Sequence, residues 1–83
     1  MTTMRLLFIG GHPKGHGEAF SIKTHSGRIL RSIVAHLQTL YDFDADYYDV
    51  WYNQGEEDVG VIEEREQSVL RFWADEGTHL IPL

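Results

Sequence analysis

Residues 5–20, RLLFIGGHPKGHGEAF, decide the fold of this chain. The run from Arg5 to Ile9 is short and apolar and is closed by two glycines, which is typical of a parallel strand buried on both faces. Residues 10–20 then hold four glycines and one proline. That composition predicts a loop rather than regular structure.

Downstream of this loop, helical and strand patterns alternate. Apolar residues recur every three or four positions over 26–40, which predicts a helix with one apolar stripe, and Thr24 or Ser26 is placed to cap it. Residues 46–52 are rich in tyrosine, valine and tryptophan and predict a second strand. A polar, acidic connection is expected over 53–60, and a second helix over 61–76 that ends at Gly77. Residues 78–83 predict a third strand.

This order of elements predicts one α/β domain over residues 1–83. It is a three-layer unit in which a short parallel sheet is flanked by two helices. Right-handed crossovers place the first strand in the centre and give the order 2-1-3. The topological switch point then falls at the carboxyl end of the first strand, so a ligand is expected at residues 10–20.

Composition and charge exclude several classes of protein. The chain has 83 residues and no cysteine, which leaves no disulfide scaffold and no thiolate zinc site. Its N-terminal apolar run is too short for a signal sequence or a membrane span, so a cytoplasmic location without membrane contact is expected. Residues 1–40 carry five Lys and Arg against one acid, whereas residues 41–83 carry two against twelve. The two halves therefore differ in net charge, +4 against −10.

The glycine-rich loop matches neither the dinucleotide fingerprint nor the P-loop. Residues 8–22, FIGGHPKGHGEAFSI, instead resemble the first-strand motif of the uracil-DNA glycosylase superfamily, in which a strand ends in G-x-x-P and a loop reaches a phenylalanine within an A-F-S-V segment. Residues 26–30 are similar to the start of that family's next helix. Trp51-Tyr52-Asn53 falls where a strand bearing an asparagine is expected, and residues 79–83 look like a later apolar strand. The resemblance covers the first half of a glycosylase.

The resemblance implies a pocket for a flipped-out base in DNA. Phe20 would stack on the base and Asn53 would read its hydrogen-bonding edge. Gly10, Gly11 and Pro13 would form the floor of the pocket. If active, such a protein hydrolyses an N-glycosidic bond in DNA repair without a cofactor or a metal.

Two features predict weak or absent activity. His12 stands where the family has its water-activating aspartate, and the nearest carboxylate is Glu18, so these two are the catalytic candidates. The family's second half, which carries its histidine and intercalating loop, has no counterpart here. Lys14, Lys23 and Arg28 are the candidates for contact with DNA phosphates.

Other interpretations of the same residues stay open. His12, His16 and Glu18 have ligand chemistry suited to zinc, but they lie in a loop that does not align the two rings as a helix would. The turn after the first strand is also similar to that of flavodoxin-like quinone reductases, which implies a flavin phosphate site. A third interpretation is a small acidic interaction protein of the phage type, whose carboxylates imitate DNA phosphates.

The pattern also predicts association. A half-glycosylase that ends on an apolar strand leaves one sheet edge and one sheet face without cover, and such edges pair or are masked. We therefore expect a homodimer or a second polypeptide that completes the sheet.

Overall fold

A computed structural model describes residues 3–14, 21–54, 59–62 and 64–83. Its elements follow the order β-α-β-β-α-β along the chain. They are β1 (Met4–Lys14), α1 (His25–Gln38), β2 (Phe43–Gln54), β3 (Val59–Ile62), α2 (Glu64–Asp75) and β4 (His79–Pro82).

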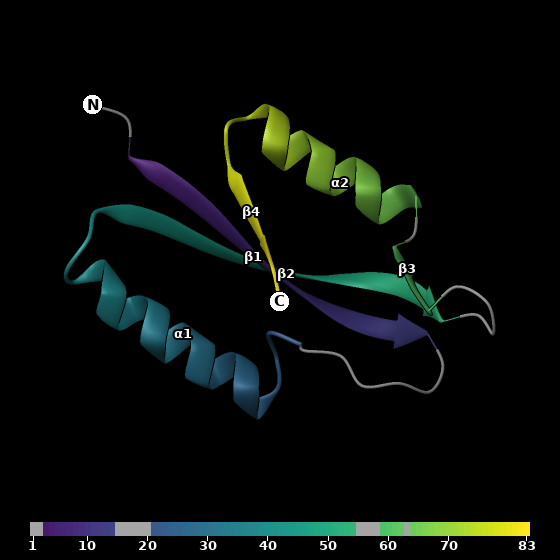
Figure 1. The fold of residues 1–83 in the computed structure, drawn as a ribbon, viewed down its shortest axis with the longest axis horizontal. Helices are drawn as coiled ribbons and strands as arrows, with labels where there is room; N and C mark the ends of the chain where they lie inside the picture. Colours follow the sequence, from purple (N-terminus) through teal and green to yellow (C-terminus); the bar gives the residue numbers. More distant parts are fainter. Residues whose placement is uncertain (1–2, 15–20, 55–58, 63) are drawn as a thin grey trace.

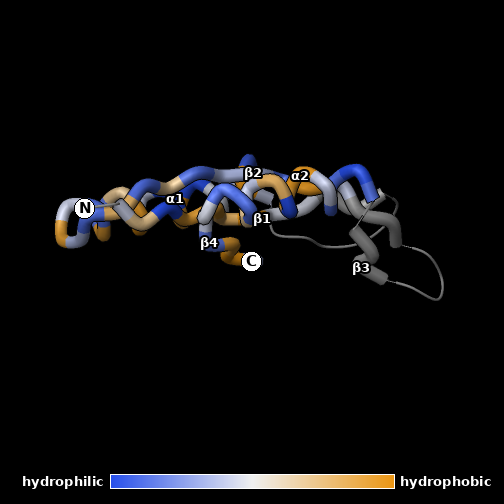
Figure 2. The backbone as a smooth tube through the Cα atoms, turned by 90° about the horizontal axis from the view of Figure 1, so that it is seen from above, coloured by the Kyte–Doolittle hydropathy of each residue, from blue (hydrophilic) through white to orange (hydrophobic). Residues whose placement is uncertain are grey.

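The four strands form one sheet in the order β3-β2-β1-β4. β1 pairs in parallel with β2 on one side and with β4 on the other, so the predicted parallel order 2-1-3 is confirmed. Figure 1 views the sheet edge-on, along the direction from one strand to the next, so the strands overlap near the centre of the picture. α1 and α2 lie on opposite faces of the sheet. Figure 2 shows β2, β1 and β4 one above another along the thinnest dimension of the molecule, which is 14 Å.

β1 is longer than the sequence predicted. The loop assigned to residues 10–20 was wrong for its first part, because β1 continues through Gly10 to Lys14 and stays paired with β2 along its whole length. Gly10 and Gly11 are buried inside the strand. A parallel neighbour supplies hydrogen bonds to these residues, and that pairing offsets their low strand propensity.

The predicted acidic connection over 53–60 was also wrong in part. β2 extends through Gln54, and β3 pairs with it in antiparallel fashion, with Tyr52 opposite Ile62 and Asn53 opposite Val61. Val61 and Ile62 thus belong to a strand rather than to the second helix, which begins at Glu64. β3 is short and its alternation covers too few residues to be distinguished from the start of a helix.

The main core lies between the sheet and α2. Leu7, Ile9 and Val50 are buried together, and four partly buried side chains pack against them: Tyr48, Leu70, Trp73 and Leu80. α2 ends at Asp75, and Gly77, the predicted stop signal, follows it with a left-handed φ of +86°. Gly77 N–H donates to Ala74 C=O at 3.0 Å and Thr78 N–H to Trp73 C=O at 3.2 Å, which is the Schellman arrangement.

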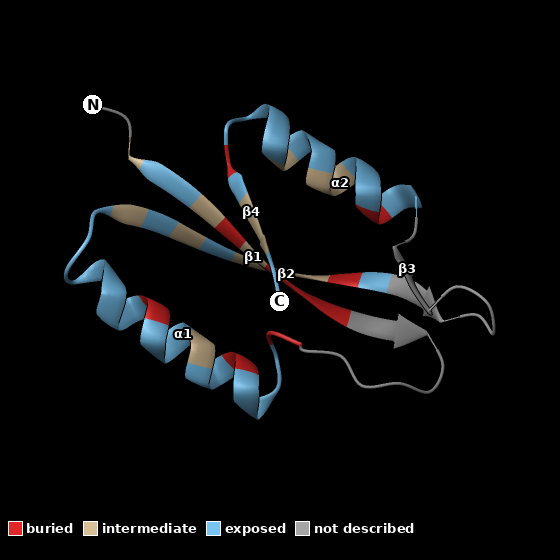
Figure 3. Cartoon of the chain, in the orientation of Figure 1, coloured by how far each residue is buried: buried red, intermediate tan, exposed pale blue. Residues whose placement is uncertain are grey.

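On the other face, α1 turns most of its apolar stripe away from the sheet. Gly27 and Val34 are its buried residues, whereas Ile29 and Ile33 are about half exposed, at 49% and 54%. Figure 3 shows α1 mostly exposed, with only short buried segments toward the sheet. Beneath α1 the Arg31 guanidinium lies 4.9 Å from the ring centre of Tyr47. That cation–π contact and the close approach of Gly27 set the rotation of the helix.

Candidate functional site

The carboxyl ends of β1 and β2 form the edge at which a ligand was expected. The parallel register sets Gly10 beside Asp49 and Gly11 beside Val50. Further along the same pair, Lys14 lies beside Asn53. The backbone that carries the predicted asparagine is therefore adjacent to the end of the glycine-bearing strand.

Asp49 fixes the point at which the chain returns from the segment 15–20. The Ser21 hydroxyl donates to Asp49 Oδ2 at 2.7 Å, and the Ile22 N–H donates to Asp49 Oδ1 at 2.7 Å. Ser21 and Ile22 are 5% and 3% exposed, so both bonds are largely shielded from water. Hydrogen bonds to an ionised acceptor are about twice as strong as neutral ones. The Asp49 carboxylate thus ties the start of the α1 segment to β2.

The start of α1 is built tightly on this anchor. Thr24, one of the two predicted candidates, caps the helix: its hydroxyl oxygen accepts from Gly27 N–H at 3.3 Å and its own O–H donates to Ser21 C=O at 2.7 Å. A Cβ on Gly27 would lie 2.1 Å from the Ile22 carbonyl oxygen. Glycine is therefore required at this position by close backbone approach, not by an unusual φ.

The predicted site residues are only partly within the described structure. Gly10 and Gly11 are buried at the end of β1, and the backbones of His12, Pro13, Lys14 and Asn53 lie in paired strands. The side chains of these last four, and all of Glu18 and Phe20, lie outside the described residues. Lys23 and Arg28 are exposed, just before α1 and in its first turns. The structure thus sets the backbone of Lys14 beside that of Asn53 at the end of the β1–β2 pair, whereas Gly10 and Gly11 lie earlier along β1, beside Asp49 and Val50.

Asp49 and Ser21 were not predicted as a pair. The sequence feature that could have indicated this pair is the position of Asp49 within the predicted second strand. Aspartate is uncommon in strands, and a partly buried carboxylate needs hydrogen-bond donors. Ser21 and Asp49 are 28 residues apart in the sequence, so no local pattern indicates that they form a hydrogen bond.

A second polar pair lies on the α2 face and was also missed. The Tyr48 hydroxyl donates to Glu66 Oε2 at 2.5 Å, and Glu66 is only 4% exposed. The hydrogen bond to Glu66 and burial both raise the pKa of Tyr48 above its usual 10.0. Glu66 lies four residues after Ile62 and four residues before Leu70. In the helical spacing of the sequence it therefore falls on the apolar side, where an acidic residue is unusual. It is therefore not available as one of the exposed phosphate surrogates of the acidic interpretation.

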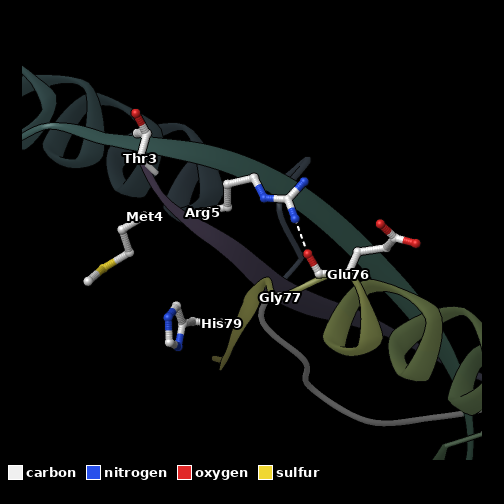
Figure 4. A pocket seen from close by; sticks show the side chains of 6 residues that line it. All are labelled: Thr3, Met4, Arg5, Glu76, Gly77 and His79. Atoms are coloured by element: carbon white, nitrogen blue, oxygen red, sulfur yellow. Dashed lines mark hydrogen bonds between the residues drawn. The ribbon is translucent and has the colours of Figure 1, made fainter. Parts of the chain in front are cut away.

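A separate hollow of about 350 Å³ lies at the opposite, amino-terminal end of β1, lined by Thr3, Met4, Arg5, Glu76, Gly77 and His79. Figure 4 shows Arg5 reaching across to the end of α2, where its guanidinium donates to the Glu76 carbonyl oxygen. This bond satisfies a carbonyl in the last turn of α2, so the Arg5 side chain has a structural role there.

Among the described residues, no group of three or more His, Asp or Glu side chains is placed to hold a metal ion. His16 and Glu18, and the side chain of His12, lie outside the described residues. Neither α1 nor α2 combines the length and apolar character that crossing a bilayer requires.

Comparison of the chain with protein-family models, with curated proteins and with solved structures finds no match.

Proposed function

We propose that this chain binds a nucleobase, free or in DNA, at the carboxyl ends of β1 and β2, in the manner that its resemblance to uracil-DNA glycosylases implies. One observation carries the proposal: Asp49 holds Ser21 and Ile22 beside Gly10, at 2.7 Å for each hydrogen bond. β1 therefore ends, and the α1 segment begins, at the edge where parallel α/β sheets bind ligands.

The roles of the residues follow from the chemistry of base recognition. Gly10 and Gly11 let a ligand approach the backbone closely, because no Cβ intervenes. Phe20, one residue before the Asp49 anchor, supplies the stacking face, and Asn53 offers a donor and an acceptor to the base edge. Lys23 and Arg28 are exposed at the start of α1, which suits contact with a phosphate.

The chain alone is proposed to bind without efficient cleavage. Hydrolysis of a glycosidic bond requires an oriented water and stabilisation of charge on the departing base. His12 occupies the position of the family's aspartate, and Asp49, the carboxylate nearest Gly10 in the strand register, is already engaged by Ser21 and Ile22.

The acidic interaction protein is the second candidate. Asp44 and Asp46 are exposed on β2 and point to the same face of the sheet, about 6.8 Å apart along the strand. That separation is about twice the phosphate spacing per DNA strand. A partner that binds DNA would be held by these carboxylates rather than by the β1–α1 segment.

The test is a titration of the purified chain with uracil and with a single-stranded oligonucleotide that contains uracil. Phe20→Ala is expected to weaken binding about five- to a hundredfold, because base stacking on an aromatic ring contributes roughly 1–3 kcal/mol. Asn53→Ala is expected to weaken binding and to reduce discrimination between bases. Phe72→Ala is the matched control, since Phe72 is 65% exposed on α2, which lies across the sheet from α1.

The alternatives give different results in the same assay. Binding of flavin mononucleotide in place of uracil would support the flavodoxin-like interpretation. No binding of base, DNA or flavin, together with capture of a DNA-binding protein that is lost in Asp44→Asn, would support the acidic interaction protein. Rapid uracil release by the unmodified chain would contradict the proposed inactivity.

A further inference from the structure

An aliphatic stripe on α1 has no partner among the described residues. Ile29, Ile33 and Leu37 are 49%, 54% and 38% exposed, and their four-residue spacing puts them on one side of the helix. Leu40, which follows the end of α1, is 63% exposed. Monomeric proteins rarely expose contiguous apolar patches of this kind. The stripe is therefore a candidate interaction surface.

The stripe lines a groove between α1 and the end of β4. The groove has a volume of about 420 Å³ and is bounded by Ser26, Ile29, Leu30, Ile33 and Leu83. Leu83 N–H donates to Ile9 C=O at 3.0 Å, which holds this wall of the groove against β1. β4 is the last strand of the sheet on this side, so the groove is open toward the sheet margin.

The lateral offset between α1 and β4 suits one further helix. α1 contacts β2, and two strand spacings of about 4.8 Å separate β2 from β4. The resulting offset of about 10 Å is the distance at which neighbouring helices pack on each other. One amphipathic helix laid beside α1 would cover the stripe and Leu83 together.

A second copy of this chain does not supply that helix. The residues of α1 include Arg28, Arg31, His25 and His36 but no acid, so two α1 helices would bring like charges together. The apolar side of α2 packs on its own sheet face through Leu70 and Trp73. Phe72 is the only large apolar side chain that α2 exposes. Neither helix of a second copy therefore offers a complementary aliphatic stripe.

We propose that the groove between α1 and β4 docks an amphipathic helix of another polypeptide, with an aliphatic stripe flanked by aspartate or glutamate. The apolar stripe supplies the buried contact area. The exposed side chains of His25, Arg28 and His36 select the acidic flanks and disfavour basic ones, whereas Arg31 lies against Tyr47. The acidic residues of α2 do not oppose this, since α2 lies on the opposite side of the sheet (Figure 1).

The experiment uses the full chain and two labelled synthetic peptides of about 15 residues, with the same leucine stripe and either glutamate or lysine flanks. Fluorescence anisotropy measures their binding. The glutamate peptide is expected to bind at least about tenfold more tightly than the lysine peptide.

Ile33→Asp is expected to weaken binding of the glutamate peptide at least about tenfold. Phe72→Asp, at an apolar position across the sheet that is also more than half exposed, is expected to leave it unchanged. Ile29→Ser serves as a second variant, and circular dichroism checks that each variant is folded.

Three results would overturn the proposal. The first is absent binding of the glutamate peptide, or equal binding of both peptides. The second is an equal effect of Ile33→Asp and Phe72→Asp. The third is self-association of the unmodified chain in sedimentation velocity that Ile33→Asp abolishes, because a second copy would then cover the stripe.

Discussion

The Ser21 hydroxyl and the Asp49 carboxylate are joined by a 2.7 Å hydrogen bond across 28 residues of sequence. The same carboxylate accepts the Ile22 N–H, so one side chain of β2 fixes the chain at the start of α1. The proposed ligand edge therefore depends on a tertiary contact rather than on the glycine-rich motif alone.

Replacement of Asp49 by alanine is expected to lower the free energy of unfolding by about 2–4 kcal/mol, because it leaves the buried Ser21 hydroxyl and Ile22 N–H without their acceptor. Urea unfolding measures the loss, and hydrogen exchange is expected to accelerate most at Ile22. The control is Asp46→Ala, which removes an exposed carboxylate from the same strand and should change stability by less than about 0.5 kcal/mol. Equal losses for the two variants would contradict the anchoring role.

Gly27→Ala is expected to destabilise the chain although alanine is the better helix former by about 1 kcal/mol. The added methyl would meet the Ile22 carbonyl oxygen at 2.1 Å, so α1 or the anchored segment must move. Gly77→Ala is the comparison: its nearest neighbour would be Arg5 Nη2 at 3.8 Å, so only the left-handed φ is penalised, by about 1 kcal/mol. Thermal unfolding of both variants, with exchange at Ile22 perturbed only by Gly27→Ala, checks this distinction.

Tyr48→Phe is expected to cost about 1–3 kcal/mol, because it leaves the buried Glu66 carboxylate without the hydroxyl that it accepts from. Glu66→Gln keeps an acceptor oxygen facing Tyr48 and is expected to cost less. Urea unfolding of the two single variants and of the double variant Tyr48→Phe with Glu66→Leu tests the pairing. If the double variant is no more stable than Tyr48→Phe alone, the Glu66 carboxylate is not the source of the loss.

The Tyr48–Glu66 pair makes the free energy of unfolding depend on pH in the alkaline range. The pKa of folded Tyr48 is raised above the ordinary 10.0, first by the hydrogen bond to Glu66 and then by burial. The folded chain therefore holds the phenol proton more tightly than the unfolded chain does, and this contribution to stability is complete below pH 10.0. It is lost as the pH rises from there through the folded pKa. The free energy of unfolding, measured with urea at increasing pH, should decline less in Tyr48→Phe than in the unmodified chain. Tyrosinate absorbance should show a tyrosine that titrates late in the unmodified chain and is missing from this variant.

The parallel sheet and its two helices were readable from the sequence because their signals are local. A closed apolar run at Leu6–Ile9, helical spacing around Val34 and around Leu70, and a glycine at Gly77 each depend on neighbours within about one turn or one strand. Right-handed crossover chirality then leaves a single arrangement, 2-1-3, for three such strands.

The strand character of Gly10–Lys14 and Val59–Ile62 could not be read in the same way. Glycine and proline argue against a strand by intrinsic preference, and only pairing with β2, supplied from residues 43–54, overrides that preference. The candidate site likewise combines a feature that is visible in the sequence with one that depends on the tertiary structure. Its glycines are visible as a motif, whereas the anchoring of Ser21 by Asp49 requires the sheet to form first.

The sequence by itself determined the two helices, the three parallel strands and their order in the sheet, but not β3. The tertiary structure alone decided the rotation of α1. The helical stripe of Ile29, Ile33 and Leu37 predicts a buried side, but periodicity does not say against what. The close contact of Gly27 with Ile22 and the stacking of Arg31 on Tyr47 turn a different side of the helix toward the sheet and leave the stripe exposed beside β4. Arg31 and Tyr47 are 16 residues apart and lie on different elements, so helical periodicity alone does not encode their contact.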